Sequence, residues 1–250
     1  MPVYQARPDL LSDRIILVTG AGDGIGREAA KSFAQHGATV ILVGRTIKKL
    51  ERTYDEVEAV GGPQAAIYPM NLEGAAPKDF AEMADTLSRE FGRLDGLLHN
   101  AAILGTLTPV ELYNIEEWHK VMQVNLNAPF MLTQACLGLL KESADASVVF
   151  TSDQVGRCGR AYWGAYAASK FAVEGLMQVL AQEVESNTNI RVNSIDPGPV
   201  RTLMRMAAYP GENHADLPTP ADVMPDYLYL MGPDSSDRNG QALTVNSEKK

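Results

Sequence analysis

The strongest structural signal in this chain is the stretch Val18-Thr-Gly-Ala-Gly-Asp-Gly-Ile-Gly26, which follows a short apolar run and leads at once into an amphipathic segment. Glycine suits positions where the backbone turns tightly and passes close to a pyrophosphate. A helix that begins directly after such a turn presents free N–H groups and the positive end of its dipole to phosphates. The motif therefore predicts a nucleotide site, with contacts from Gly20, Asp23, Gly24, Ile25 and Gly26.

The residues that follow narrow the kind of nucleotide. Arg27 and Glu28 stand where a mononucleotide P-loop would continue with Gly-Lys-Ser/Thr, so that site is not predicted. NAD-binding proteins place an acid about 20 residues past the glycines, but here the second predicted strand ends in Val43-Gly-Arg-Thr46. Arg45 can bind a 2′-phosphate, so we expect NADP(H) to be favoured over NAD(H). The competing interpretation leaves Arg45 in solvent, and Asp23 adds a carboxylate where a second cation could have helped.

Short apolar, β-branched runs alternate with longer segments of helical periodicity along the chain. The runs are nearly continuous in apolar residues, as in strands covered on both faces of a parallel sheet. We therefore predict an α/β protein, a single Rossmann-like domain over residues 1–250, with a doubly wound sheet of about seven parallel strands flanked by helices. The expected strands are Arg14–Thr19, Ala38–Val43, Gln64–Met70, Leu94–His99, Ser147–Ser152, Ile190–Ile195 and Gln241–Val245. The expected helices are Gly24–His36, Ile47–Val60, Pro77–Phe91, Asn114–Leu140 and Tyr162–Val184.

The composition excludes several classes of partner. A chain of 250 residues with 45% apolar residues can bury the core of one domain. The net charge of −9 and the scattered cations argue against nucleic acid and anionic membranes. The N-terminal arm, residues 1–12, lacks an apolar leader, and only Cys136 and Cys158 occur, so we expect a reduced, cytoplasmic protein without a membrane span. The four histidines lack metal-ligand spacing, and no metal site is predicted.

The segment Val200–Met231 departs from the regular alternation, because it is long, poorly periodic and rich in turn-forming residues. Long irregular loops inside compact domains often cover a binding site, so residues 200–231 are predicted to form a substrate lid. Met204, Met206 and Tyr209 would then line an apolar pocket. The alternatives are an ordinary surface excursion and core packing.

Tyr166 and Lys170 stand four residues apart in Trp163-Gly-Ala-Tyr-Ala-Ala-Ser-Lys170, at the start of an apolar predicted helix. Side chains with this spacing share one face of a helix. An ammonium beside a phenol favours the phenolate, so we expect Lys170 to lower the pKa of Tyr166. Tyr166 is therefore a candidate general acid/base.

Taken together, these motifs resemble the short-chain dehydrogenases/reductases over residues 12–245. Thr19-Gly-x-x-x-Gly-Ile-Gly26 resembles the cofactor signature of that family, and Tyr166-x-x-x-Lys170 resembles its active-site signature. His99-Asn-Ala-Ala102 is similar to the family's Asn-Asn-Ala-Gly stretch, and Asn125 matches its helix asparagine.

Two further segments carry the resemblance. Pro197-Gly-Pro-Val-Arg-Thr202 resembles the turn that meets the nicotinamide amide, and Asn71-Leu72 stands where the family usually has Asp-Val beside the adenine. Cofactor contacts implied by the resemblance, beside the glycine turn, come from Asn71, Leu72, Asn100, Ala101, Tyr166, Lys170, Pro197, Gly198, Val200 and Thr202.

The resemblance also implies roles and an assembly. Tyr166 would exchange a proton with the substrate oxygen while the nicotinamide exchanges hydride. Lys170 would hold the nicotinamide ribose, and Asn125 would position a water that links Lys170 to solvent. The helices Asn114–Leu140 and Tyr162–Val184 would pair between subunits in a homodimer or homotetramer.

One family position is altered. The residue thirteen before the tyrosine is a serine in the family and is Asp153 here. A serine hydroxyl donates to the substrate carbonyl oxygen, whereas an ionised carboxylate repels it and raises the pKa of Tyr166. Ser152 is adjacent, but successive strand residues point to opposite faces, so Ser152 could substitute only if the strand end twists.

Three interpretations of Asp153 follow. It could be protonated and donate as a carboxylic acid. It could form an ion pair with Lys170 or Arg157 and leave a slow or altered enzyme. Or the catalytic step could be lost. The leading prediction is an NADP(H)-dependent oxidoreductase of a small carbonyl or alcohol substrate, with catalytic residues Tyr166, Lys170, Asn125 and Asp153; the alternative is a weak or inactive nucleotide-binding sensor or scaffold.

Overall fold

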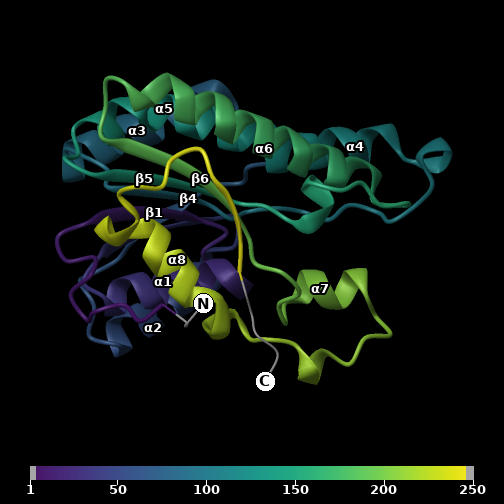
Figure 1. Cartoon of the computed structure of the whole chain (residues 1–250), viewed down its shortest axis with the longest axis horizontal. Helices are drawn as coiled ribbons and strands as arrows, with labels where there is room; N and C mark the ends of the chain where they lie inside the picture. Colours follow the sequence, from purple (N-terminus) through teal and green to yellow (C-terminus); the bar gives the residue numbers. More distant parts are fainter. Residues whose placement is uncertain (1–3, 246–250) are drawn as a thin grey trace.

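Seven parallel strands form one sheet in the order β3-β2-β1-β4-β5-β6-β7 (Figure 1). The computed structural model describes residues 4–245. Because β1 pairs with both β2 and β4, the two halves of the sheet are wound outward from this point, which is the switch point of a doubly wound fold. The strands are β1 Ile15–Thr19, β2 Thr39–Gly44, β3 Ala66–Pro69, β4 Gly96–His99, β5 Ala146–Thr151, β6 Ile190–Asp196 and β7 Ala242–Thr244.

The helices lie in two layers (Figure 1). One face of the sheet is covered by α3 Pro77–Phe91, α4 Ile115–Met122, α5 Ala128–Lys141 and α6 Gly164–Glu185. The other face is covered by α1 Gly24–Gln35, α2 Ile47–Ala59 and α8 Met224–Met231, while α7 Leu203–Ala208 stands apart from both layers. Within the described chain, no helix is long and apolar enough to cross a membrane.

Alternate residues of each strand enter two separate cores. In β1, Ile16 and Val18 pack with α1 and α8, whereas Leu17 packs with α3, α5 and α6. All three side chains have 0% exposure. Burial on both faces explains why the strands read as continuous apolar runs, and the predicted doubly wound sheet of seven parallel strands is confirmed. Every strand boundary lies within two residues of the predicted one.

The prediction of one helix over Asn114–Leu140 is wrong, because the structure divides it. A π-helical turn, Gln123–Asn127, separates α4 from α5. Pro129 has no N–H to donate to the carbonyl of Asn125, four residues earlier, so the regular ladder of hydrogen bonds cannot continue through this point. The next predicted helix also begins late, at Gly164, because Tyr162 has a φ of +74°.

Two segments that were predicted to lie outside the regular alternation, the N-terminal arm and the lid, contribute residues to the core. Of the N-terminal arm, the described residues 4–12 bury Leu10 and Leu11, and the hydroxyl of Tyr4 donates to Asp234 at 2.7 Å. Of the predicted lid, residues 224–231 form α8, in which Tyr227 has 0% exposure. Val200 and Val223 also enter the core beside α1 and α8, so the part of the predicted lid that lies outside the two helical layers is between these two residues.

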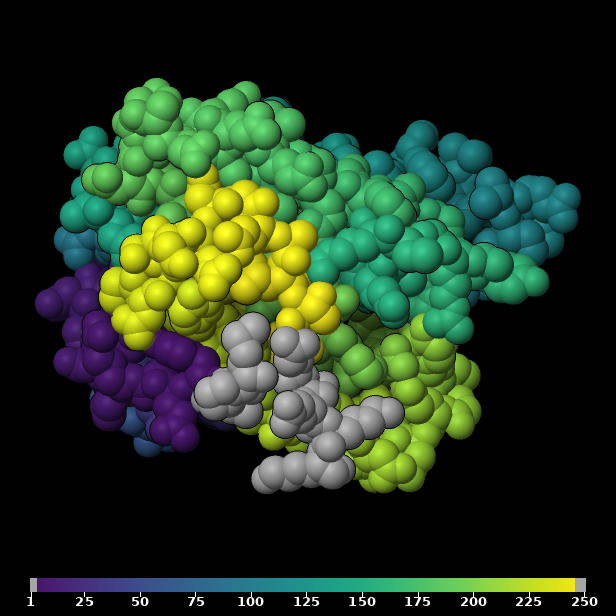
Figure 2. Space-filling model, in the orientation of Figure 1, coloured from purple at the N-terminus to yellow at the C-terminus, as the bar shows by residue number. Residues whose placement is uncertain are grey.

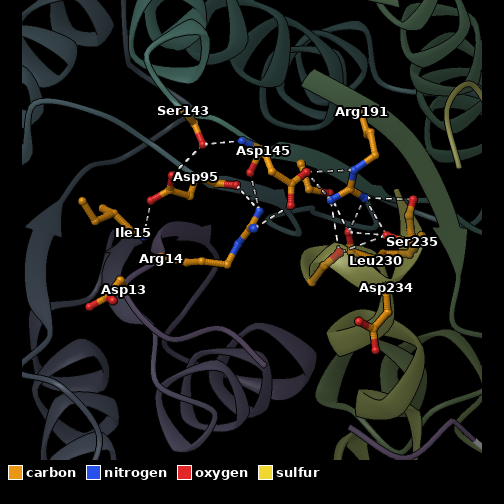
Figure 3. A network of polar contacts seen from close by, with 12 residues as sticks. Asp13, Arg14, Ile15, Asp95, Ser143, Asp145, Arg191, Leu230, Asp234 and Ser235 are labelled. Carbon is orange, nitrogen blue, oxygen red and sulfur yellow. Dashed lines mark hydrogen bonds and ion pairs between the residues drawn. The ribbon is translucent and has the colours of Figure 1, made fainter. Parts of the chain in front are cut away.

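The amino ends of the central strands are tied together by opposite charges (Figure 3). Arg14, just before β1, donates to the carboxylate of Asp145 at 2.8 Å and to the carbonyls of Asp95 and Asp145. Arg191, near the start of β6, donates to the carboxylate of Asp145 at 3.0 Å and to the hydroxyl of Ser235 at 2.5 Å. These contacts join the amino ends of β1, β4, β5 and β6 to the end of α8.

Candidate active site

A cleft of about 480 Å³ opens at the carboxyl edge of the sheet, the edge opposite the ion-pair network. Ligands of doubly wound proteins bind at this edge beside the switch point, and the volume suits a small-molecule site. Gly26 and Asn125, predicted for cofactor contact or catalysis, do not line the cleft, and neither do Met206 and Tyr209, predicted for the substrate pocket. The predicted residues that do line it are Gly20, Asp23, Gly24, Ile25, Arg45, Asn71, Leu72, Asn100, Ala101, Asp153, Tyr166, Lys170, Pro197, Gly198, Val200, Thr202 and Met204.

The glycine turn brings the start of α1 against the end of β1. Gly20 and Gly24 have positive φ values of 69° and 51°, which side chains with a Cβ rarely adopt. Gly26 lies behind the turn, where an added Cβ would collide with the carbonyl oxygen of Gly20 and the amide of Asn100. The N–H of Gly24, the first of α1, donates to the Asp23 carboxylate, whereas the N–H groups of Ile25 and Gly26 have no partner within the helix by position and can serve as donors at the wall of the cleft.

Thr19 has a structural role in the site that was not predicted from the sequence. Its hydroxyl donates to the carbonyl of Leu98 at 3.2 Å and accepts the N–H groups of Asn100 and Ala101 at 3.0 and 3.1 Å. Thr19 therefore fixes the loop after β4 against the glycine turn. Its place as the first residue of the glycine motif was the available signal.

A second cation, Lys49, lines the cleft near Arg45 and was missed from the sequence. Lys49 Nζ donates to the carboxylate of Asp23 at 2.5 Å, and the other oxygen of that carboxylate accepts the N–H of Gly24 at 2.8 Å. Burial alone would raise the pKa of Asp23, but the bonds from Lys49 and Gly24 together lower it. The carboxylate of Asp23 is thus held in its ionised form by an ion pair with Lys49.

Asn125 holds the loop after β4 from inside the π-helical turn. Its side-chain amide donates to the carbonyl of Ile103 at 3.0 Å and to the hydroxyl of Ser169 at 3.1 Å, and its oxygen accepts the N–H of Ile103 at 2.8 Å. Both donor hydrogens of the amide are therefore used. The side chain positions Ile103, which lines the cleft, and is not free to donate to a water beside Lys170.

Tyr166 and Asp153 meet at the wall of the cleft. The Tyr166 hydroxyl donates to Asp153 Oδ2 at 3.3 Å, while Asp153 Oδ1 accepts the N–H of Val155 at 3.0 Å. The expectation that Lys170 lowers the pKa of Tyr166 is wrong. Burial and the neighbouring Asp153 carboxylate raise the pKa of Tyr166 well above its ordinary value. The opposing effect predicted for Asp153 therefore wins.

Among the described residues, Lys170 lies over the ring of Tyr166 but makes no hydrogen bond to its hydroxyl. Its amine lies 5.6 Å from the centre of the Tyr166 ring and donates to the carbonyl of Thr151 at 2.6 Å. Burial lowers the pKa of Lys170 to about 8, although carboxylates including that of Asp153 oppose the shift. The anticipated ion pair of Asp153 with Lys170 or Arg157 is not found among the described residues. Arg157 pairs instead with Glu174, at 3.1 Å.

Ser152 is buried at the end of β5 and lines the cleft. Its N–H donates to the carbonyl of Ile195 at 2.7 Å, but its hydroxyl has no hydrogen-bond partner within residues 4–245. A buried hydroxyl without a partner is costly unless a ligand or water satisfies it. Ser152, the neighbour of Asp153, therefore has a hydroxyl that is available to donate a hydrogen bond to a ligand in the cleft.

The far end of the cleft is apolar. Trp163 lies between Tyr166 and Tyr209, with ring centres 5.7 and 5.8 Å away, and Met204 packs against the same cluster. Arg160 ties Tyr209 to the segment before α6 through a hydrogen bond of 2.6 Å. Figure 2 shows the yellow-green segment around α7 lying against the green segment that precedes α6. Of the three residues predicted for an apolar pocket, Met204 lines the cleft and packs in this cluster, Tyr209 packs in the cluster without lining the cleft, and Met206 does neither.

The donors of the cleft fit a dinucleotide that carries an extra phosphate. The glycine turn leaves space where a Cβ would clash, the helix start supplies N–H groups, and Arg45 and Lys49 supply positive charge at the end of β2. The unpartnered hydroxyl of Ser152 stands at the other end of the cleft, beside Tyr166.

The chain belongs to the short-chain dehydrogenase family, because the family described as short chain dehydrogenase matches residues 14–213. Among its relatives is the oxidoreductase YciK of Escherichia coli (strain K12), which is 51% identical over 247 residues, 99% of this chain and 97% of that one.

Solved structures extend the match. A short chain dehydrogenase from Pseudomonas syringae is 56% identical, with a TM-score of 0.95 over 96% of this chain and 98% of that one. A short chain dehydrogenase from Escherichia coli CFT073, complexed with NADPH, is 51% identical, with a TM-score of 0.93 over 96% of this chain and 100% of that one. The family resemblance inferred from the motifs is confirmed.

Proposed function

We propose that this protein is an NADP(H)-dependent oxidoreductase that interconverts a carbonyl and an alcohol on a small molecule. The proposal is carried by one observation: the glycine turn before α1 and the Tyr166–Lys170 pair of α6 line a single cleft. One wall can hold a dinucleotide while the other exchanges a proton with a substrate beside it.

The preference for the phosphorylated cofactor rests on the charges at the end of β2. Arg45 and Lys49 bring a guanidinium and an ammonium to the wall where a 2′-phosphate would lie. Asp23 repels such a phosphate less than its sequence position suggests, because Lys49 neutralises it. The NADPH complex of the Escherichia coli CFT073 relative supports the same choice.

The residues of the chain handle the proton in this reaction. When bound, the nicotinamide supplies or accepts the hydride. Tyr166, buried in the cleft wall, presents its hydroxyl to the substrate oxygen and exchanges a proton with it. Lys170 adds positive charge behind the site, and Asn125 fixes the loop that carries Ile103. Asp153, Tyr166 and Lys170 are thus the proposed catalytic residues, and Asn125 is a positioning residue.

The alternative is a non-catalytic nucleotide-binding protein. The observation in its favour is that the Tyr166 hydroxyl donates to Asp153, which ties up the acid/base group. Asp153 also lacks the hydroxyl that the family serine donates to the substrate oxygen, and loss of one such donor typically costs ~10²–10³ in turnover, so low turnover is expected of the oxidoreductase.

Residues 200–223 are the proposed cover of the substrate end. Within them, Met204, Arg205 and Ala208 of α7 line the cleft. Arg205 is held by Glu212 through two hydrogen bonds of 2.7 and 2.6 Å and stacks on Tyr209 at 3.7 Å from its ring centre. A cover of this composition, facing Trp163, suits a substrate with an apolar body.

We also propose a homodimer or homotetramer. Phe130 on α5 and Phe171 and Val179 on α6 are 46%, 45% and 55% exposed, although they are large and apolar. Such side chains gathered on neighbouring helices are typical of a surface that another chain covers. Light scattering coupled to gel filtration should give the mass of two or four chains; the mass of one chain would contradict the proposal.

Cofactor binding and turnover separate the two functions. Calorimetric titration should show tighter binding of NADPH than of NADH. A panel of ketones, aldehydes and secondary alcohols should then reveal cofactor turnover. NADPH binding without turnover by either the wild type or Asp153→Ser would favour the non-catalytic protein. Equal affinity for NADH and NADPH would contradict the cofactor assignment.

A further inference from the structure

We propose that Asp153 is the terminal proton acceptor of this site and that it works through the hydroxyl of Tyr166. The inference rests on the proposed oxidoreductase function and adds to it the route of the proton. In this arrangement the tyrosine does not act as a phenolate base. It relays a proton between the substrate oxygen and a carboxylate.

The geometry of Asp153 carries the inference. The residue caps a short 3₁₀ turn, Gln154–Gly156, and its Oδ1 is anchored by the N–H of Val155 at 3.0 Å. Oδ2 is thereby aimed at the Tyr166 hydroxyl, which donates to it at 3.3 Å. This distance is long for an O–H···O bond, so the two groups can approach further as the proton transfers.

The surroundings of Tyr166 explain why it cannot serve alone as the base. The side chain is 5% exposed, and a phenolate there would face the Asp153 carboxylate at hydrogen-bond distance. Among the described residues, the Lys170 amine donates to the carbonyl of Thr151 and makes no hydrogen bond to the phenol. Tyr166 therefore stays protonated, and it can accept a substrate proton only if it releases its own at the same time.

The proposed step in alcohol oxidation moves two protons. The substrate O–H bond breaks and a new O–H bond forms at Tyr166 Oη, while the original Oη–H bond breaks and an O–H bond forms at Asp153 Oδ2. The substrate carbon gives its hydride to the oxidised nicotinamide, which completes the balance. Asp153 is half-buried, so its proton can pass to solvent. In carbonyl reduction the transfers run in reverse, and Asp153 must carry a proton at the start.

The charges that face this pair come from three elements. Lys170 of α6 and Arg205 of α7 interact electrostatically with Asp153. Asp196, at the end of β6, interacts with it as well. Because the relay ends on Asp153, its protonation controls both directions of the reaction. Oxidation should rise with pH as the carboxylate ionises, and reduction should rise as it is protonated.

Two variants test the relay. Asp153→Asn keeps the size of the side chain and removes the base, and Asp153→Ser restores the family hydroxyl. In both, the rise of kcat/KM for oxidation of a secondary alcohol with NADP⁺ should move upward by at least about one pH unit, because a phenol then replaces the carboxylate as the base. An unchanged pH profile would overturn the proposal.

A second readout does not need turnover. Protein labelled with [ζ-¹³C]tyrosine reports the ionisation of Tyr166, whose resonance is identified by its loss in Tyr166→Phe. Without cofactor, Tyr166 should ionise at lower pH in Asp153→Asn than in the wild type. Asp196→Asn is the matched control: it removes a nearby carboxylate without a hydrogen bond to the phenol, and it should give a smaller change. Equal changes in both variants would overturn the relay.

The outcomes separate this inference from the function on which it rests. If the wild type binds NADPH but only Asp153→Ser turns over, Asp153 blocks the site, and the relay is wrong while the family chemistry of the cleft stands. If neither protein turns over any substrate of the panel, the proposed oxidoreductase function fails with it.

Discussion

The two edges of the sheet hold their buried charges in opposite ways. At the amino edge, Arg14 and Arg191 both face Asp145, and hydroxyls and carbonyls take most of their remaining hydrogens (Figure 3). At the carboxyl edge, Lys170 lies within electrostatic reach of three carboxylates, those of Asp153, Glu174 and Asp196, yet its amine donates to a backbone carbonyl.

The difference shows what each edge does. A buried charge that is paired and hydrogen-bonded in the folded chain contributes to holding that fold, and its loss leaves a partner stranded. In the amino-edge network, Arg14 Nε is a buried nitrogen without a hydrogen-bond partner within the described residues, although the other groups of that arginine are bonded. The carboxyl edge gathers several perturbed groups in one cleft: a phenol against a carboxylate, an amine with a lowered pKa and the unpartnered hydroxyl of Ser152. Perturbed groups gathered in a cleft are typical of a site where a ligand is bound and transformed.

Breaking the amino edge should give the largest effect on stability. Arg191→Met strands part of Asp145 and the carbonyls near Ser235, so the free energy of unfolding should fall by about 3–5 kcal/mol. Urea unfolding measures this. NADPH affinity of the folded variant should stay within a few-fold of wild type.

Arg52→Met provides the control for that variant. Its side chain is 59% exposed and pairs with Glu56 on the surface of α2, so its loss should change stability by less than about 1 kcal/mol. Equal losses in the two variants would show that the amino-edge network has no special structural role.

The next effect is expected at the wall of the cleft where the 2′-phosphate of the cofactor would bind. Arg45→Ala removes a charged hydrogen bond to the proposed 2′-phosphate, which is worth about 1.5–3 kcal/mol, so NADPH affinity should fall about 10- to 100-fold while NADH affinity changes little. Lys49→Ala should also lower NADPH affinity, because it removes an ammonium and leaves the Asp23 carboxylate without its ion pair beside the phosphate. Calorimetry with both cofactors measures the ratio, and an unchanged ratio in Arg45→Ala would remove Arg45 from the phosphate site.

The pH dependence of stability tests the buried amine of Lys170. Burial lowers the pKa of Lys170 to about 8, below the value near ~10.4 of an unfolded lysine. Between these values the unfolded chain binds more protons, so the contribution of Lys170 to the free energy of unfolding rises with pH, by at most ~1.4 kcal/mol per pH unit. Below pH 8 the group destabilises the fold by a constant amount.

Lys170→Met isolates this contribution. Unfolding of the wild type and the variant, compared at pH 7.5 and at pH 10, should show the wild type gaining stability relative to the variant at the higher pH. A difference that stays constant would mean that the folded chain does not disfavour the charged amine.

The sequence was sufficient to predict features that depend on neighbouring residues in the chain. The glycine turn, each apolar strand and the Tyr166–Lys170 pair are each defined by a short stretch of sequence. The sheet and most cleft residues could therefore be predicted. Pro129 is an equally local signal, and it indicates the break between α4 and α5 that the prediction of one continuous helix missed.

Features that depend on contacts between distant segments could not be predicted. Lys49 meets Asp23 only because α2 packs beside α1, and the amine of Lys170 reaches the carbonyl of Thr151 only because α6 packs on β6, the neighbour of β5. Helical spacing placed Lys170 and Tyr166 on one face, but it could not show that the amine would turn to the strand and leave the phenol to Asp153.

The central claim is that the carboxyl edge performs proton transfer through Tyr166, and Tyr166→Phe tests it most directly. The variant loses only a hydroxyl, so it should bind NADPH as tightly as the wild type and unfold at a similar urea concentration. Its turnover on the best substrate of the panel should fall ~10²–10⁴-fold, the usual contribution of a general acid/base. Turnover equal to that of the wild type would contradict the account.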